Sequence, residues 1–241
     1  VYRHLERGDS YLTNLTIRSE ISSSISLEEL FTLSRAKYKL FLRDAFLVFS
    51  PEIFVQIRND TIYSFPMKGT INAGLPAARE TILNDPKELA EHVTIVDLIR
   101  NDISQVATNV EVKRFRYIEE IRTTRHHLLQ VSSEISGRLP QGWRETVGTL
   151  LMKLLPAGSV SGAPKHKTVE IIREAEGQPR GYYTGVCGIF DGENLDSGVM
   201  IRFIEKDNGK LYYRSGGGIT TQSICEAEYR EAIDKIYVPV N

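Results

Sequence analysis

The feature that most constrains this chain is a set of short apolar segments separated by dipeptides that favour tight turns. Asp191-Gly192 and Asn208-Gly209 separate three such segments near the C-terminus, and Asn59-Asp60 separates two earlier ones. Asn, Asp and Gly adopt positive φ angles readily, which suits two-residue turns between antiparallel strands. Because these segments are interrupted by helices without a regular βαβ alternation, the sequence predicts an α+β fold with largely antiparallel sheets.

The best-defined helix is predicted to begin at Asp85. This residue is a suitable N-cap, Pro86 fits the first helical position, and Glu88 is placed to complete a capping box. Apolar residues then recur at helical spacing, which predicts one buried face. That face is expected to consist of Leu89, Val93, Val96 and Ile99.

Composition excludes several classes of protein. Of the 241 residues, 41% are hydrophobic and 25% charged, which is typical of a globular protein with a substantial core. Thirty basic and 31 acidic side chains leave a formal charge of -1, so neither a nucleic-acid binder nor a binder of anionic membranes is expected. Any charged ligand must therefore be met by local charge. Since no methionine precedes Val1, the chain is expected to be the interior of a longer protein.

The cysteines and the hydropathy pattern bear on localisation. Cys187 and Cys225 form neither a disulfide framework nor a zinc pattern, so reduced thiols in a reducing cytoplasm are expected. The sequence has no apolar stretch of about 18 residues and no signal-peptide pattern. A cytoplasmic protein is the default expectation.

Carboxylates at helical spacing are the first candidate site. Glu88 and Glu91 are three residues apart on one predicted helix, and Glu228 and Glu231 are three apart on another. Oxygen ligands without histidine or cysteine suit magnesium, which keeps several of its waters. The alternatives are structural, because Glu88 can simply complete its capping box and Glu231 can pair with Lys235 four residues later.

Glycine-rich loops and one arginine are candidates for binding anions. PAGSVSGAPK leads into a helix at Pro164, and SGGGIT offers a second group of backbone amides. Either segment could also be only a tight loop or a strand end. Arg202 lies in VMIRFI, predicted to be one apolar strand, where a buried arginine requires a carboxylate of the protein or of a ligand.

Lys68 is the most specific single candidate for a catalytic residue. It lies in FPMKGT, between an apolar strand end and Gly69, where desolvation could favour a neutral, nucleophilic amine. Glu52, in SPEIF, could act as a general acid. The alternatives are a surface lysine at a turn and an ordinary turn carboxylate.

Taken in order, these motifs resemble those of the chorismate-utilising enzymes. The resemblance covers nearly all of the chain, and the subgroup it most resembles is the aminodeoxychorismate synthases, the chorismate-aminating component of p-aminobenzoate and folate synthesis. The motifs that carry it are GDSYLTNLT, SPEIF, PMKGT, ELAEHVTIVDLIRND, PAGSVSGAPK, RGYYTGVCG, IRF, SGGGI and EAEYREAIDK.

The resemblance assigns the chemistry to Lys68 and Glu52. In the aminating subgroup the lysine of this motif adds to C2 of chorismate as the C4 hydroxyl leaves, and the glutamate protonates that hydroxyl. Ammonia then attacks C4 and expels the lysine, giving 4-amino-4-deoxychorismate. The lysine with which isochorismate and salicylate synthases activate water is replaced by Leu12, so water activation by that route is not expected.

The resemblance also assigns a metal to the four glutamates. Glu91 and Glu228 would contact Mg²⁺ directly, and Glu88 and Glu231 would act largely through its waters. The metal would bind the ring carboxylate of the substrate. This is physically reasonable, because four acids would repel a dicarboxylate unless a cation lay between them.

The remaining site residues are carried over in the same way. Gly217, Gly218 and Lys235 match groups that hold the ring carboxylate, and Arg202 and Tyr183 match groups that hold the enolpyruvyl carboxylate. Two further positions differ from the usual family residue. Ser161 replaces a threonine and keeps its hydroxyl, whereas Gln130 replaces a histidine and can hydrogen-bond but cannot be a cation.

The family resemblance implies an architecture and a partner as well. Residues 1–241 would form a catalytic domain of two stacked antiparallel sheets flanked by helices, with the active site between the sheets and a further N-terminal segment absent. No glutaminase-type cysteine-histidine motif is present, so ammonia would come from a glutamine amidotransferase subunit or be supplied free. Two rival functions are an anthranilate synthase component I and a non-catalytic binding module.

Overall fold

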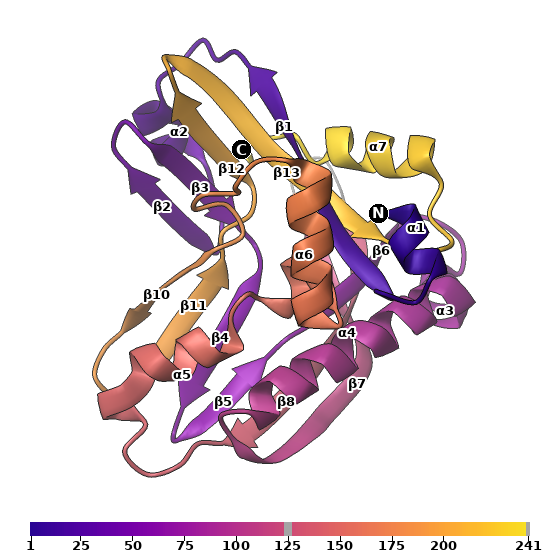
Figure 1. Ribbon diagram of the computed structural model, residues 1–241, viewed down its shortest axis with the longest axis vertical. Coiled ribbons are helices and arrows are strands. Elements are labelled where there is room, and N and C mark those ends of the chain that lie inside the picture. Colours follow the sequence, from indigo (N-terminus) through magenta and orange to yellow (C-terminus); the bar gives the residue numbers. More distant parts are fainter. Residues whose placement is uncertain (123–126, 240–241) are drawn as a thin grey trace. The chain divides into compact units, whose positions relative to one another are not determined.

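The computed structural model describes residues 1–122 and 127–239, and the chain divides into two compact units (Figure 1). Unit 1 comprises residues 1–54, 160–189 and those from 197 onward, and unit 2 comprises residues 55–159 and 190–196. The predicted α+β fold with two antiparallel sheets and flanking helices is confirmed. Among the described helices, none has the combination of length and apolar character that crossing a bilayer requires.

Unit 1 is built on a six-stranded sheet in the order β2-β3-β12-β13-β1-β9. The strands are β1 (Leu12–Ile21), β2 (Tyr38–Leu42), β3 (Phe46–Ser50), β9 (Gly162–Ala163), β12 (Phe203–Asp207) and β13 (Lys210–Ile219). The longest pairing joins β1 to β13 in antiparallel register, with Leu15 opposite Gly217 and Asn14 opposite Gly218. The glycine-rich end of β13 is therefore an ordered strand, not a loose loop.

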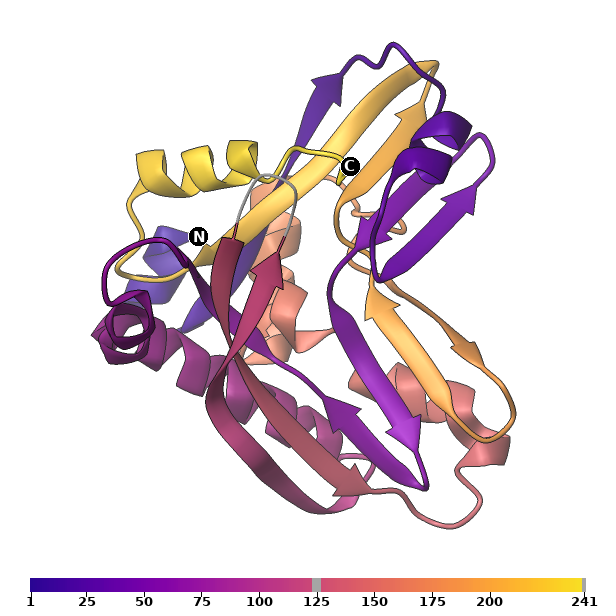
Figure 2. The same ribbon diagram turned by 180° about the vertical axis from the view of Figure 1, so that it is seen from behind.

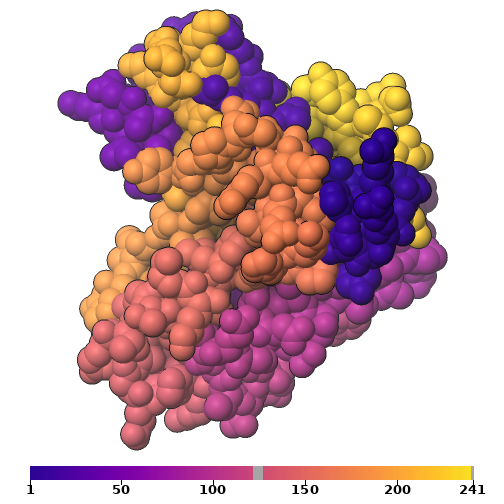
Figure 3. All heavy atoms as spheres, in the orientation of Figure 1, coloured from indigo at the N-terminus to yellow at the C-terminus, as the bar shows by residue number. Residues whose placement is uncertain are grey.

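Four helices accompany this sheet. They are α1 (Tyr2–Glu6), α2 (Leu27–Leu33), α6 (Lys165–Glu176) and α7 (Cys225–Asp234). Helix α6 lies across β1, and α7 lies beside β13 (Figure 1). In the space-filling view the indigo α1 lies directly against the orange α6, where His4 Nε2 is 3.6 Å from Glu174 Oε2 (Figure 3).

Strand β3 lies at the centre of the unit 1 core. All five of its residues are buried, which requires packing on both faces of the sheet because successive side chains alternate. Leu47 and Phe49 pack on one face, and Phe46 and Val48 on the other. The first pair packs with Leu30, Ile204 and Tyr213. The second pair packs with Tyr183, Met200 and Phe203.

The second sheet has seven strands, in the order β10-β11-β4-β5-β8-β6 with β7 paired to β8. The strands are β4 (Ile53–Arg58), β5 (Thr61–Ser64), β6 (Met67–Asn72), β7 (Thr108–Arg122), β8 (His127–Arg138), β10 (Val186–Phe190) and β11 (Leu195–Val199). Within unit 2, β8 pairs along one edge with β7 and along the other with β5 and β6. Figure 2 shows β7 and β8 running side by side.

The turn between β4 and β5 is the hairpin that the sequence predicts. Asn59 and Asp60 have φ angles of 50° and 59°, as a turn with two left-handed residues requires. The Asp60 carboxylate accepts hydrogen bonds from Trp143 Nε1 at 2.9 Å and Arg144 Nη1 at 2.7 Å, which lower the pKa of Asp60. The turns at Asp191-Gly192 and Asn208-Gly209 are also confirmed, as the links from β10 to β11 and from β12 to β13.

One predicted strand is wrong. The apolar run around VMIRFI is two strands, because β11 ends at Val199 and β12 begins at Phe203 in the other sheet. Between them, Arg202 has a φ of 52°, in the left-handed region that a non-glycine residue rarely adopts. Continuous hydrophobicity concealed the point at which the chain changes sheets.

The helices of unit 2 are α3 (Ala78–Asn84), α4 (Pro86–Ser104) and α5 (Val147–Leu154). The predicted start of α4 is confirmed, since Asp85 is the N-cap and accepts a hydrogen bond from the Glu88 backbone N–H at 3.0 Å. Its predicted buried face is wrong in the first half, where Leu89 and Val93 are exposed. The residues buried instead are His92, Ile95, Val96, Leu98, Asp102 and Ile103.

Candidate functional site

Lys68, Glu88 and Glu91 come together in unit 2. Lys68 is the second residue of β6, and its Nζ lies 2.7 Å from Glu91 Oε2 on α4. The Glu91 side chain is only 10% exposed, and Lys87 Nζ lies 3.8 Å from its other oxygen. The lysine and the carboxylate that the family resemblance singled out therefore form a half-buried ion pair.

The capping box predicted for Asp85 and Glu88 is only half formed. Only the backbone N–H of Glu88 bonds to Asp85, and its Oε2 is buried without a hydrogen-bond partner. This oxygen lies against Gly69, where an added Cβ would be 2.8 Å from it. Burial raises the pKa of Glu88, and the positive charge of Lys68 opposes that rise. A buried carboxylate oxygen without a donor is costly, so a proton or a cation would stabilise it.

A second cluster lies in unit 1, where α7 meets the glycines of β13. Lys235 Nζ donates to Glu231 Oε1 at 2.6 Å and to the Gly216 carbonyl at 2.9 Å. Ser223 Oγ donates to Glu228 Oε1 at 2.6 Å. A Cβ built on Gly217 would lie 3.6 Å from Lys235 Nζ and 3.7 Å from an oxygen of Glu228 and of Glu231.

This cluster combines two carboxylates, which are ligands for a cation, with one ammonium, which can bind an anion. The missing side chain at Gly217 leaves a space towards which one ammonium and two carboxylates converge. The Lys235–Glu231 pair four residues apart is the structural alternative given for Glu231, and it is present. Among the described residues no lysine pairs with Glu228, which is held by a serine hydroxyl.

Arg202 and Tyr183 lie in the same unit. The Arg202 guanidinium donates to the Lys235 carbonyl at 3.3 Å and lies 4.9 Å from the centre of the Tyr237 ring. Its Nε is buried without a hydrogen-bond partner, and within the described residues no carboxylate pairs with it. An anion would satisfy the buried Nε of this half-buried arginine. Burial raises the pKa of Tyr183 to about 12, so its hydroxyl stays protonated and can donate a hydrogen bond.

The other predicted residues occupy ordered positions. Glu52 follows β3, its N–H bonds to Ser50 Oγ at 3.1 Å, and its carbonyl accepts from the Val199 N–H at 3.1 Å. Ser161 is buried beside β1, and its carbonyl accepts from the Asn14 N–H at 2.8 Å. Gln130 lies in β8 opposite Thr70 of β6, two residues beyond Lys68. Their chemical roles stay predictions.

The magnesium site also stays a prediction. Glu88 and Glu91 belong to unit 2, and Glu228 and Glu231 to unit 1. Across residues 1–122 and 127–239, no group of three or more His, Cys, Asp or Glu side chains is arranged to hold a metal ion. The fit rests on the donors themselves, which are all oxygens, and on the partnerless Oε2 of Glu88.

One residue near Lys68 was missed from the sequence. His92 is 1% exposed, its Nε2 lies 2.7 Å from Ser133 Oγ, and burial lowers its pKa to about 4. The nearby backbone of Lys68 opposes this lowering of the His92 pKa by a smaller amount, and Nδ1 is buried without a hydrogen-bond partner. The available signal was its helical spacing from Ile95 and Val96, which puts a histidine on the buried face of α4.

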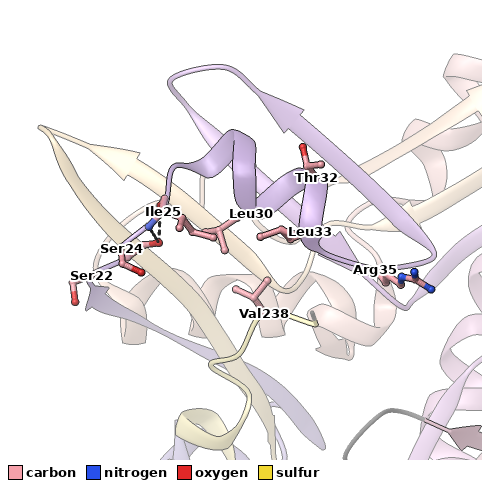
Figure 4. A pocket seen from close by; sticks show the side chains of 9 residues that line it. Ser22, Ser24, Ile25, Leu30, Thr32, Leu33, Arg35 and Val238 are labelled. Carbon is pink, nitrogen blue, oxygen red and sulfur yellow. Dashed lines mark hydrogen bonds between the residues drawn. The ribbon is translucent and has the colours of Figure 1, made fainter. Parts of the chain in front are cut away.

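A separate hollow in unit 1 contains none of the predicted site residues. It has a volume of about 680 Å³, and Leu30, Leu33 and Val238 point towards one another across it (Figure 4). Serines 22–24 lie at one side, between β1 and α2. Its lining lacks a carboxylate or a lysine, so it does not have the chemistry of the two charged clusters.

Comparison with known proteins assigns the whole chain to one family. The family model for chorismate binding enzymes matches residues 1–241. An uncharacterized PabA-like protein of Pasteurella multocida is 56% identical over 240 residues, covering 100% of this chain and 74% of that protein. Aminodeoxychorismate synthase component 1 of Salmonella typhimurium is 38% identical over 248 residues, covering 96% of this chain and 53% of that protein.

A solved structure agrees with these sequence matches. Anthranilate synthase component I from Streptococcus pneumoniae superposes with a TM-score of 0.81 at 31% identity. The match covers 98% of this chain and 54% of that one, so the chain spans about half the length of this relative.

Proposed function

Because this chain belongs to the family of chorismate binding enzymes, we propose that it aminates chorismate at C4 to give 4-amino-4-deoxychorismate. The observation that carries the proposal is Lys68, which occupies the motif position that distinguishes the aminating subgroup. Its amine lies 2.7 Å from the half-buried carboxylate of Glu91. The similarity to aminodeoxychorismate synthase component 1 supports it.

Lys68 is the proposed nucleophile and Glu52 the proposed general acid. The neutral Lys68 amine forms a bond to C2, the ring double bonds shift, and the C4–O bond breaks as Glu52 protonates the departing hydroxyl to water. Ammonia then bonds to C4, and the C2–N bond breaks to return the lysine amine. The Glu52 carboxylate takes the surplus proton, so the net change is that ammonia enters and water leaves.

The charged clusters are proposed to hold the substrate. Lys235 and the backbone N–H groups of Gly217 and Gly218 bind the ring carboxylate, and Arg202 with the protonated Tyr183 hydroxyl binds the enolpyruvyl carboxylate. Ser161 and Gln130 supply further hydrogen bonds. The partnerless Arg202 Nε supports this assignment, because a bound carboxylate would satisfy it.

Magnesium is the proposed cofactor, held directly by Glu91 and Glu228 with Glu88 and Glu231 acting through its waters. When bound, it would neutralise the substrate carboxylate against the surrounding acids. The four glutamates would hold the positive charge of the metal in place. Without the metal, Glu91 is paired with Lys68. Ammonia is proposed to come from free ammonium or from a separate glutamine amidotransferase subunit. The name of the relative, aminodeoxychorismate synthase component 1, implies such a second component.

The test is a product assay with chorismate, Mg²⁺ and ammonium. Addition of aminodeoxychorismate lyase should release p-aminobenzoate, and no anthranilate should appear with or without the lyase. Anthranilate formed directly would assign the chain to the anthranilate synthases, which the Streptococcus pneumoniae structure represents. If a folded full-length protein forms neither p-aminobenzoate nor anthranilate, the proposal is wrong.

A further inference from the structure

One face of β13 is directed towards the residues that follow α7. The Tyr213 hydroxyl donates to the Tyr237 carbonyl at 2.9 Å. A Cβ on Gly217 would lie 3.6 Å from Lys235 Nζ. The register between β13 and β1 is unbroken around these residues, so successive side chains of β13 alternate between the two faces of the sheet. Ser215 lies midway between Tyr213 and Gly217 and therefore shares their face.

The Ser215 hydroxyl is buried without a bond to the rest of the chain. The residue is 3% exposed, and among the described residues its Oγ finds no hydrogen-bond partner. Buried hydroxyls are nearly always hydrogen-bonded, because an unmade bond leaves the cost of desolvation uncompensated. An alanine would occupy the same place in the strand without that cost. The hydroxyl is therefore available to a ligand that brings an acceptor to this face of β13.

A second unsatisfied donor lies beside Ser215. Strands β12 and β13 pair in antiparallel register from Phe203 and Arg214 onward. One step before this pair, Arg202 falls opposite Ser215. The Arg202 guanidinium donates to the Lys235 carbonyl at 3.3 Å, so it lies on the side of the sheet along which the residues after α7 run. Its Nε is buried and, in the part of the chain that the structure describes, has no acceptor. A carboxylate between the two groups would accept from both.

We propose that Ser215 is a further substrate-binding residue, whose hydroxyl donates to the carboxylate that Arg202 binds. This inference rests on the proposed function, in which that carboxylate is the enolpyruvyl group of chorismate. Gly217, two residues further along the same face, is proposed to meet the ring carboxylate. Positions two apart on a strand are separated by about 7 Å. One face of β13 would thus meet both carboxylates of a ring that carries them at C1 and, through an ether, at C3.

A pair of unreactive ligands tests which carboxylate Ser215 binds. 3-(Carboxymethoxy)benzoate carries both carboxylates, whereas 3-ethoxybenzoate lacks the one on the ether side chain. Their dissociation constants are measured by titration calorimetry with Mg²⁺. Ser215→Ala should weaken binding of the dicarboxylate by about 10- to 100-fold, because a hydrogen bond to a charged group is worth this much. Binding of 3-ethoxybenzoate should change by less than about threefold.

Thermal unfolding separates ligand binding from a structural role. Because the Ser215 hydroxyl has no partner among the described residues, Ser215→Ala should leave Tm unchanged or raise it. Ser10 is the matched control, since it is 1% exposed and its hydroxyl donates to the Leu12 carbonyl at 3.0 Å. Ser10→Ala should therefore lower Tm. A fall of Tm in Ser215→Ala as large as that in Ser10→Ala would show a structural hydroxyl and overturn the inference.

Two binding results would also overturn it: an unchanged affinity of Ser215→Ala for the dicarboxylate, or an equal loss for both ligands. Chorismate is titrated as well, in the Lys68→Ala background so that it stays unreacted, and should show the loss seen with the dicarboxylate. If Ser215→Ala gives the expected losses but the unsubstituted protein does not aminate chorismate, the proposed reaction fails and the role of Ser215 stands. If the protein binds neither chorismate nor the dicarboxylate, both fail.

Discussion

Replacing Gly69 by alanine tests the irregular pairing of β6 with β8, where the register shifts between Met67 and Thr70. The φ of 89° costs a residue with a Cβ about 1–2 kcal/mol. The new methyl group would also lie 2.8 Å from Glu88 Oε2, so the buried carboxylate must leave its rotamer at a further cost of about 0.5–1.5 kcal/mol. Reduced entropy of the unfolded chain offsets about 0.4–1 kcal/mol. The expected net destabilisation is about 0.5–3 kcal/mol.

Gly148 provides the matched control. It lies in α5 with a negative φ, and a Cβ there would meet no atom within 4 Å. Gly148→Ala should therefore stabilise the protein by about 0.4–1 kcal/mol. Urea denaturation and calorimetry measure both variants, and each kcal/mol corresponds to a Tm change of about 2–4 °C for a chain of this size. A Gly69→Ala protein as stable as the unsubstituted one would refute the reasoning.

Three further predictions concern the scaffold around the site. Arg180→Met should lower the free energy of unfolding by about 3–5 kcal/mol, because it leaves the 3% exposed Glu176 carboxylate without its cation. Arg100→Met removes an exposed ion pair and is the control, and an equal loss in both variants would contradict the prediction. Gly162→Ala should cost more than about 3 kcal/mol in urea denaturation, since its Cβ would overlap a backbone carbonyl of β1; a milder loss would show that β1 can move. The raised pKa of Tyr183, about 12 against 10 when unfolded, means that the stability of its neutral form is complete below pH 10 and is lost as the pH rises through 12. Tyr183→Phe should reduce this alkaline loss, and phenolate absorbance that develops with an ordinary midpoint would disprove it.

Local signals in the sequence predicted local structure well. Asn59-Asp60 forms its turn because both residues tolerate left-handed φ, and α4 begins at Asp85 and Pro86 because capping depends on adjacent residues. The strand through Arg202 failed because the apolar run continues where the chain changes sheets. Periodicity cannot report a change of sheet, since residues of both strands are buried.

The chemistry of the site was less accessible. Helical spacing placed Glu88 and Glu91 on one face, but the ion pair of Glu91 with Lys68 depends on how β6 packs against α4. The buried face of α4 was misread for a related reason. A histidine can be buried when a ring nitrogen finds a partner, and the hydroxyl that partners His92 Nε2 comes from β8, 41 residues further along the chain. Hydrophobic patterning therefore selected Leu89 and Val93 in its place.

The most direct test of the central claim is the intact mass of the protein after incubation with chorismate and Mg²⁺ without ammonia. We predict a covalent adduct with the mass of chorismate minus one water, located at Lys68 by peptide mapping and absent from Lys68→Ala. Lys87→Ala is the matched control, because Lys87 also approaches Glu91, at 3.8 Å, and should keep the adduct. An adduct that persists in Lys68→Ala, or none in the folded unsubstituted protein, would contradict Lys68 as the nucleophile.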